Sequence, residues 1–212
     1  MKLYGYFRSS AAFRVRIALN LKGLDYEQVS VHLGKGRQFE PEFAAISPQN
    51  LVPVLEHDGH LLYQSLAIIQ YLDEKFPTPP LLPTDPVARN RVRSLALISA
   101  SEIHPLNNLR VLNYLTNTLK LSDEQKNAWY QHWVTVGFNA LEHRLAMENQ
   151  TGRFCHGDEP GFADISLVPQ VANANRFKVD LAPFPTIVRI NEECLNLDAF
   201  RKAQPANQPD AE

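Results

Sequence analysis

Cysteine is scarce in this sequence. The 212 residues include only two cysteines, Cys155 and Cys194, which lie far apart and belong to no Cys-x-x-Cys pair. Two isolated thiols do not build the disulfide framework of a small secreted protein, and neither has the spacing of a redox pair. We therefore expect two free thiols and a reducing, cytoplasmic location.

The sequence also has no surplus of positive charge and no long apolar run. Lys and Arg number 21 against 23 Asp and Glu, a formal net charge of −2. Proteins that hold nucleic acid through its phosphates normally carry a basic surplus, so we expect no such partner. No apolar run approaches the roughly 18–20 residues of a membrane span, and the start of the chain does not resemble a secretory signal. We expect no membrane association. Because no His, Cys, Asp and Glu set has metal-site spacing, we also predict no metal.

What remains is an ordinary globular composition, with 44% hydrophobic and 21% charged residues. The first third alternates two kinds of segment: strands at 2–6, 26–32, 51–56 and 60–63, and helices at 11–22, near 41–46 and at 65–76. Asp58-Gly59, set between two short apolar runs, is typical of a β-hairpin. This order predicts a small mixed sheet covered by helices, with its first two strands parallel.

Prolines interrupt this pattern at 77–83, where four of the seven residues are proline. Helices and central strands do not accept so many prolines, so we place a domain boundary there. The later segments read as helices: 86 to about 119, 122–147, 162–177, and shorter pieces from 184 onward. We therefore expect an α/β domain over 1–80 and an all-α domain over 87–212, with the polar end 205–212 forming a loose tail.

The junction of the first strand and first helix carries the most informative residues, Ser9 and Ser10. A helix N-terminus attracts anions, and a serine hydroxyl placed there can stabilise a thiolate and lower its pKa. A serine in this place is also a common helix cap. Tyr6, near the end of the first strand, is a rival thiol activator. Helix-terminus electrostatics favours Ser9.

Two later places offer ligand contacts. Val52-Pro53 stands just before the hairpin, where a cis bond would turn the chain and present the Val52 backbone to a ligand, although an edge-strand proline is the simpler alternative. Gln64 and Ser65 stand at the start of the next helix, which is again receptive to an anion, or Ser65 simply caps that helix.

These places belong to a wider pattern. The run from Tyr6 to Leu19 resembles the zeta-class glutathione transferase signature Ser-Ser-Cys-x-x-Arg-Val-Arg-Ile-Ala-Leu. Further matches follow in order along the chain: Leu51-Val52-Pro53, Gln64-Ser65 with Ala67-Ile68-Ile69, His104 to Asn108, Ala163-Asp164, Leu167 to Val171, and Arg176-Phe177. The resemblance extends from Met1 to Pro209.

The resemblance implies the glutathione transferase fold: an α/β thioredoxin-like N-terminal domain plus an all-α C-terminal domain, in a homodimer that binds glutathione. It implies further that the backbone at Val52-Pro53 meets the cysteinyl part of glutathione. Gln64 and Ser65 would receive its γ-glutamyl carboxylate, and Ser9 would hydrogen-bond its sulfur. His104 and Asn108, expected one helical turn apart, would add hydrogen bonds from the other domain.

The chain departs from the family pattern at two positions. Ala11 stands where the family often has a cysteine after the paired serines, which removes an auxiliary thiol but leaves the serine hydroxyl. Gly161 stands where the family often has Ser or Thr three residues before an aspartate, so Asp164 lacks its reciprocal capping partner.

Relatives of this class isomerise maleylacetoacetate or maleylpyruvate, which are small anionic diacids. Arginine suits their carboxylates, and Arg8, Arg110 and Arg176 are the candidate anchors, with Arg8 and Arg176 next to the chemistry. We expect a glutathione-dependent cis–trans isomerase. The short Gly34–Arg37 loop and Arg110 favour maleylpyruvate slightly. Two alternatives stay open: a transferase that conjugates electrophiles or haloacids, and a non-catalytic module with this fold.

Overall fold

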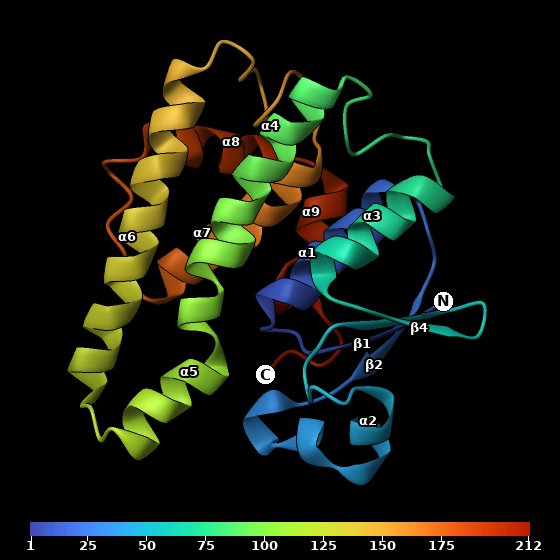
Figure 1. The fold of residues 1–212 in the computed structure, drawn as a ribbon, viewed down its shortest axis with the longest axis vertical. Coiled ribbons are helices and arrows are strands. Elements are labelled where there is room, and N and C mark those ends of the chain that lie inside the picture. The colour runs from blue at the N-terminus through green and yellow to red at the C-terminus, as the bar shows by residue number, and fades with distance from the viewer. The chain divides into compact units, whose positions relative to one another are not determined.

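The computed structural model describes the whole chain, Met1–Glu212, and the chain forms two compact units. Unit 1 contains Met1–Leu81 together with Leu195–Glu212, and unit 2 contains Leu82–Cys194. Figure 1 shows a sheet with helices in unit 1 and helices alone in unit 2. No helix combines the length and the apolar character needed to cross a bilayer.

A four-stranded mixed sheet organises unit 1, in the order β2-β1-β3-β4. Its elements are β1 (Lys2–Gly5), α1 (Ser10–Leu21), β2 (Glu27–Ser30), α2 (Pro41–Ile46), β3 (Val54–His57), β4 (His60–Tyr63) and α3 (Ser65–Lys75). β1 pairs with β2 in parallel, as the pattern predicted, and with β3 antiparallel. Asp58 and Gly59 have φ angles of 49° and 77°, the positive values that a two-residue hairpin turn requires.

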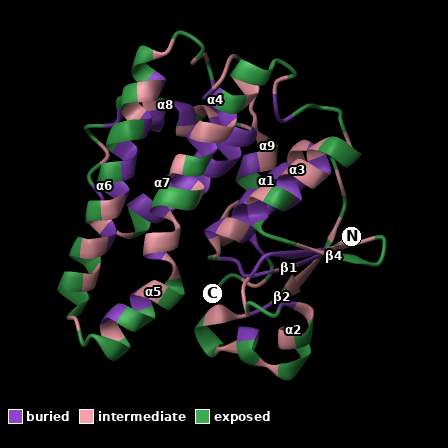
Figure 2. Ribbon diagram, viewed as in Figure 1, coloured by how far each residue is buried: buried purple, intermediate pink, exposed green.

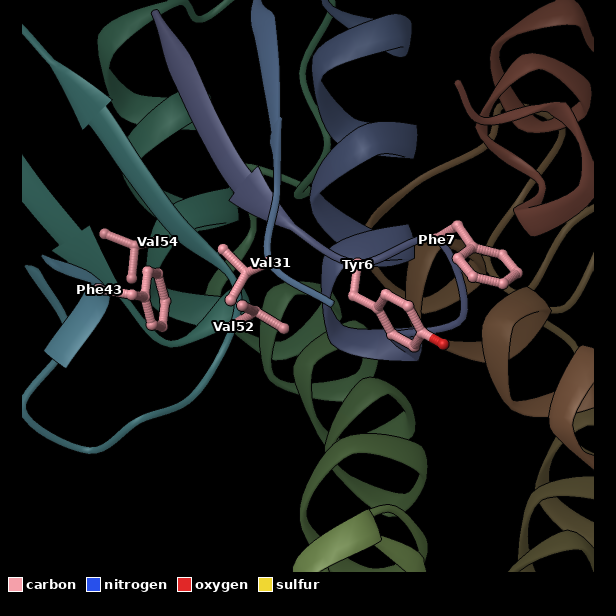
Figure 3. Packing of buried hydrophobic residues seen from close by; sticks show 6 residues of the cluster. All are labelled: Tyr6, Phe7, Val31, Phe43, Val52 and Val54. Atoms are coloured by element: carbon pink, nitrogen blue, oxygen red, sulfur yellow. The ribbon is translucent and has the colours of Figure 1, made fainter. Parts of the chain in front are cut away.

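α1 is buried on nearly all sides rather than on one stripe. Every residue from Ala12 to Leu19 is buried, including Arg14 and Arg16. Beside it, apolar side chains from β3, α2 and neighbouring loops form a cluster, labelled in Figure 3: Tyr6, Phe7, Val31, Phe43, Val52 and Val54. A helix that is apolar all round belongs in a protein interior. The two arginines on α1 therefore need partners within the fold.

The end of the chain packs with unit 1, which differs from the expected range 87–212 for the helical domain. α9 (Asp198–Ala203) lies against α1, where Arg16 Nε donates to the Ala203 carbonyl at 3.0 Å. Beyond it, Asp210 accepts hydrogen bonds from Gln28 and Ser30, at 2.9 and 2.8 Å. The expectation of a loose tail was wrong because its polar residues find partners on β2.

Unit 2 consists of helices that the sequence pattern largely anticipated. Its α-helices are α4 (Pro86–Leu97), α5 (Leu109–Asn113), α6 (Asp123–Met147), α7 (Phe162–Arg176) and α8 (Pro185–Leu195), the last of which ends at the boundary of the unit. α6 begins with the predicted capping box between Ser122 and Gln125. α7 is buried along most of its length (Figure 2).

The helix expected from 86 to about 119 is broken. After α4 come a π-helical segment (Ile98–Ile103), a 3₁₀ turn (Pro105–Asn107), α5 and a second π-helical segment (Tyr114–Thr118). Pro105 has no N–H for a continuing helix, and Asn108 is extended (φ −66°, ψ 147°) and caps α5. Short π-helical segments of this kind frequently lie at functional sites.

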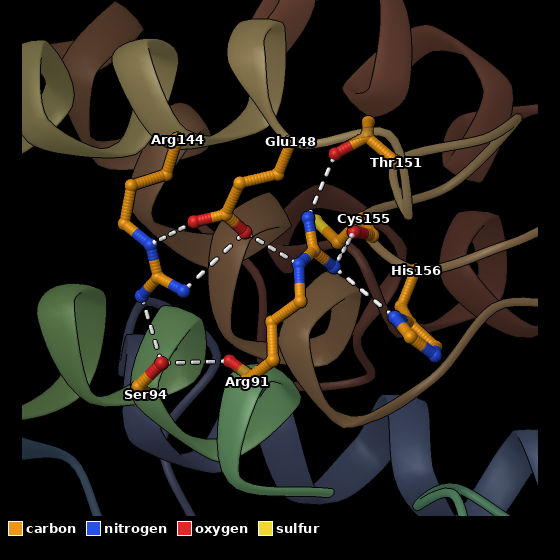
Figure 4. A network of polar contacts seen from close by, with 7 residues as sticks. All are labelled: Arg91, Ser94, Arg144, Glu148, Thr151, Cys155 and His156. Carbon is orange, nitrogen blue, oxygen red and sulfur yellow. Dashed lines mark hydrogen bonds and ion pairs between the residues drawn. The ribbon is translucent and has the colours of Figure 1, made fainter. Parts of the chain in front are cut away.

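A charged network ties the loop after α6 to α4 (Figure 4). The Glu148 carboxylate accepts from Arg91 on α4 and from Arg144 on α6, and these arginines hold the pKa of Glu148 below its usual value. Arg91 also donates to the Thr151 hydroxyl and to the Cys155 carbonyl, each at 2.8 Å. Because Arg91 is buried, these partners are what make its charge tolerable.

Candidate functional site

The N-terminus of α1 is capped by Ser9. Its backbone is extended (φ −69°, ψ 114°) and its Oγ accepts from the Ala12 N–H at 3.2 Å. A hydroxyl carries one hydrogen besides its acceptor lone pairs, and the Ser9 hydrogen meets no acceptor in the chain. Capping and anion binding are therefore compatible here: the lone pair serves the helix while the hydrogen stays available to a ligand.

The loop that leads into Ser9 is held from two sides. Arg16 donates to the Tyr6 and Phe7 carbonyls, at 3.4 and 3.1 Å, and the Phe7 N–H donates to Asp210 Oδ2 at 3.1 Å. Burial lowers the pKa of Arg16 to about 10, which leaves it charged at neutral pH. The loop position is thus fixed by a buried cation on α1 and a carboxylate near the end of the chain.

Tyr6 and Ser10, the rival thiol activators, are both buried at 7% exposure. The Tyr6 ring packs edge-on to Phe7, with centroids 4.7 Å apart, and belongs to the cluster of Figure 3. Arg8 is exposed, and its guanidinium carbon lies 4.9 Å from the Phe7 ring centroid. Tyr6 is thus a core residue, while Arg8 extends into solvent beside Ser9.

The Val52-Pro53 peptide bond is cis. The strand ladder begins at Val54, which pairs with Tyr4 and Tyr63. Val52 lies outside that ladder, and its backbone N–H and C=O make no hydrogen bond within the chain. Both groups remain available to an extended peptide.

Four polar side chains meet at the N-terminus of α3. Gln64 has a φ of 66°, unusual for a residue with a side chain, and donates to Gln49 Oε1 at 3.0 Å. Ser65, the next residue, is 7% exposed. Its Oγ accepts from Nη1 of Arg14 at 3.2 Å. Sequence reasoning missed Arg14, although an arginine inside a nearly continuous apolar helix was the available signal.

In unit 2, His104 and Asn108 are brought together, but not by a continuous helix. His104 follows the first π-helical segment, and its Nε2 lies 3.5 Å from Asn108 Nδ2. The intervening 3₁₀ turn replaces the helical turn that we expected. Arg110 stands on α5 rather than on the helix of His104; it is exposed, and its N–H donates to Asn108 Oδ1 at 3.1 Å.

Arg176 is the last residue of α7 and is exposed. Its guanidinium carbon lies 5.0 Å from the Phe177 ring centroid, and that ring stacks on Tyr130 with centroids 3.5 Å apart. Burial raises the pKa of Tyr130 to about 12, and the Arg176 charge and hydrogen bond oppose the rise. Tyr130, which sequence reasoning also missed, therefore helps to orient Arg176.

Asp164 keeps its backbone hydrogen bonds although Gly161 replaces the Ser or Thr that the family often has at that position. The Asp164 carboxylate accepts from the Gly161 and Cys155 N–H groups, each at 2.9 Å. Glycine lacks only the side-chain half of the capping box. Burial raises the pKa of Asp164, and the two N–H donors act against that rise.

Known proteins resemble this chain in both sequence and structure. The family description "Glutathione S-transferase, N-terminal domain" matches residues 3–80. The maleylpyruvate isomerase of a Ralstonia species is 50% identical over 211 residues, covering 100% of both chains. A holo structure of maleylpyruvate isomerase, described as a bacterial zeta-class glutathione S-transferase, superposes with a TM-score of 0.99 at 50% identity and full coverage of both chains. Maleylacetoacetate isomerase of Methylobacterium extorquens AM1, with bound malonate and glutathione, gives a TM-score of 0.97 at 46% identity, again with full coverage of both chains.

These matches show that the chain belongs to the glutathione transferase family. Within the family it is a zeta-class member, because the resemblance to zeta-class isomerases covers both units at about half identity. The prediction of a thioredoxin-like domain followed by helices is confirmed.

Proposed function

We propose that this chain is a glutathione-dependent cis–trans isomerase that converts a maleyl diacid, maleylpyruvate or maleylacetoacetate, into its fumaryl isomer. The observation that carries the proposal is the Ser9 hydroxyl at the N-terminus of α1, whose hydrogen has no acceptor within the chain. The full-length likeness to enzymes with this activity supports it.

Unit 1 fits glutathione in three places, each of which suits one part of the ligand. A thiolate suits the α1 terminus with Ser9, and the cysteinyl peptide suits the open backbone at Val52-Pro53. The γ-glutamyl carboxylate suits the α3 terminus with Gln64 and Ser65. The Arg14 guanidinium, which donates to Ser65 Oγ, is a buried cation with no carboxylate partner in the chain, so an anion held by Ser65 would offset its charge.

Bound glutathione supplies a thiolate that adds to the cis double bond, allows rotation about the resulting single bond and is then expelled, so it is regenerated. Ser9 donates its hydroxyl hydrogen to the sulfur, and the partial positive charge of α1 adds to that stabilisation. Arg8 and Arg176 hold the substrate carboxylates and stabilise the negative charge that develops next to the carbonyl. Arg110, which is also exposed, is a third anchor, and His104 with Asn108 contributes hydrogen bonds to glutathione.

One assay tests the proposal. Purified protein, glutathione and each maleyl diacid are mixed, and both the trans product and free glutathione are followed. We expect a trans product without loss of glutathione. Stoichiometric consumption of glutathione would establish the conjugating transferase instead, and no reaction with either diacid would refute the isomerase. The ratio of the two kcat/KM values identifies the preferred diacid.

Residue roles are tested by two substitutions. Ser9→Ala removes the sulfur donor, and we expect kcat to fall about 10²-fold or more, as for other donors to a developing anion, with little change in the substrate KM. Arg176→Ala removes a carboxylate anchor, and we expect mainly a higher substrate KM. An unchanged turnover in Ser9→Ala would assign thiol activation to Ser10 or Tyr6.

The assembly and location complete the proposal. The family resemblance supports a homodimer. The two free, buried cysteines are consistent with a cytoplasmic location. Light scattering coupled to gel filtration measures the assembly, and a monomeric mass would exclude the dimer.

A further inference from the structure

Arg14 is an exceptional charge in unit 1. It is 2% exposed, and desolvation lowers its pKa to about 10, so it stays a cation at neutral pH. No carboxylate of the chain pairs with it, in contrast to Lys22, which pairs with Asp73 at 2.6 Å. Its single hydrogen bond goes to Ser65 Oγ. Nε and Nη2 have no partner.

Burying an unpaired cation costs folding free energy, and buried arginines are therefore normally paired. Arg16, two residues further along the same helix, shows the usual solution, because its guanidinium donates to three backbone carbonyls. Arg14 lacks such a set. Its environment is therefore incomplete in the chain alone, and a negative charge nearby would complete it.

The contact between Arg14 and Ser65 also determines which side chain donates the hydrogen bond. Arginine has donors only, so Ser65 Oγ must accept in this hydrogen bond. The hydroxyl hydrogen of Ser65 is then free to donate elsewhere, and the positive guanidinium polarises it toward stronger donation. Ser65 opens α3, so the same point receives the partial positive charge of the helix end.

We propose that Arg14 is the buried counter-charge for the γ-glutamyl carboxylate of glutathione and acts through the Ser65 hydroxyl as a positioning residue. This inference rests on the proposed function, since it deepens the glutathione site. Arg14 need not touch the ligand: Ser65 donates to the carboxylate while Arg14 donates to Ser65. The charge of the ligand then offsets the desolvated cation, and the pair contributes affinity that a neutral residue could not supply.

The test compares two ligands by calorimetry. One is glutathione, and the other is 4-aminobutanoyl-cysteinyl-glycine, which lacks only the γ-glutamyl carboxylate. In the unaltered protein we expect glutathione to bind about 10- to 100-fold more tightly, as hydrogen bonds to charged groups imply. In Arg14→Met this ratio should fall to near one, and in Ser65→Ala likewise. The double variant should lose no more than either single variant.

Comparing two ligands on one variant separates recognition from folding, because a general loss of stability lowers both affinities alike. Arg14→Lys provides the charge-conserving control, and we expect an intermediate ratio; it also serves as the test if Arg14→Met does not fold. A ratio that is unchanged in both Arg14 variants would overturn the inference while leaving the isomerase intact. Failure of the unaltered protein to bind glutathione at all would overturn the proposed function itself.

Discussion

We expect the substitution Gly137→Ala on α6 to destabilise the protein, and to stabilise it once a clashing neighbour is removed. A Cβ at this position would lie 2.2 Å from Ile103 Cγ1 and 2.3 Å from its Cδ1, where ordinary contacts are about 3.5–4.0 Å. Gly137→Ala gains about 1 kcal/mol of helix propensity. Overpacking costs about 1–3 kcal/mol, and an overlap this deep places the cost near the upper end. We expect a net loss of about 2 kcal/mol, which lowers Tm by about 4–8 °C.

The control is the same substitution in an Ile103→Ala background, measured by urea unfolding. Ile103 is 1% exposed, so its truncation alone costs about 2–5 kcal/mol. The truncation also removes both clashing atoms, and Gly137→Ala should then stabilise the protein by about 1 kcal/mol. If Gly137→Ala destabilises equally in both backgrounds, the close approach of α6 to the π-helical segment is not what requires glycine.

Three further predictions follow. Asp210→Ala should cost about 1–3 kcal/mol in a thermal melt because the Phe7 N–H loses its acceptor; an unchanged melting temperature would count against a structural role for the chain end. Burial raises the pKa values of Cys155 and Cys194, so we expect neither thiol to react with a thiol reagent in the folded state and both to react after unfolding. Their contribution to the free energy of unfolding should not change with pH below about pH 8.5. It should fall above that pH, because the thiols of the unfolded chain then ionise; a constant value above about pH 8.5 would refute the raised pKa values. The arginines lower the pKa of Glu148, so its contribution is present above about pH 4.3 and lost as pH falls further; Glu148→Gln should flatten that acid limb of a melting-temperature profile, and an identical limb would refute this assignment.

The fold of unit 1 was readable from the sequence because its signals are local. The Asp58-Gly59 turn and the parallel pairing of the first two strands follow from neighbouring residues. The break at Pro105 was missed, although proline signals it, because the apolar pattern continues past it. The packing of Leu195–Glu212 on unit 1 could not be read, since it depends on partners nearly the whole chain away.

In the candidate site, too, some residues could be found from local sequence signals and others only from the fold. Ser9 was found because a serine before a helix is a local signal, and the structure adds that its hydrogen is unengaged. Arg14 was missed because its partner Ser65 lies 51 positions further on, and no spacing rule connects them. Similarly, the link from Tyr130 to Arg176 exists only once α6 and the end of α7 are packed.

The return of the chain end to unit 1 has a consequence for biosynthesis. The ribosome makes Leu195–Glu212 after all of unit 2, yet these residues supply acceptors to α1 and to the loop before it, through the Ala203 carbonyl and Asp210. Domains generally fold in order as they emerge, but unit 1 lacks these hydrogen bonds until Leu195–Glu212 has left the ribosome. A stop codon shortly before Leu195 would therefore damage unit 1, although most of that unit would already have been synthesised.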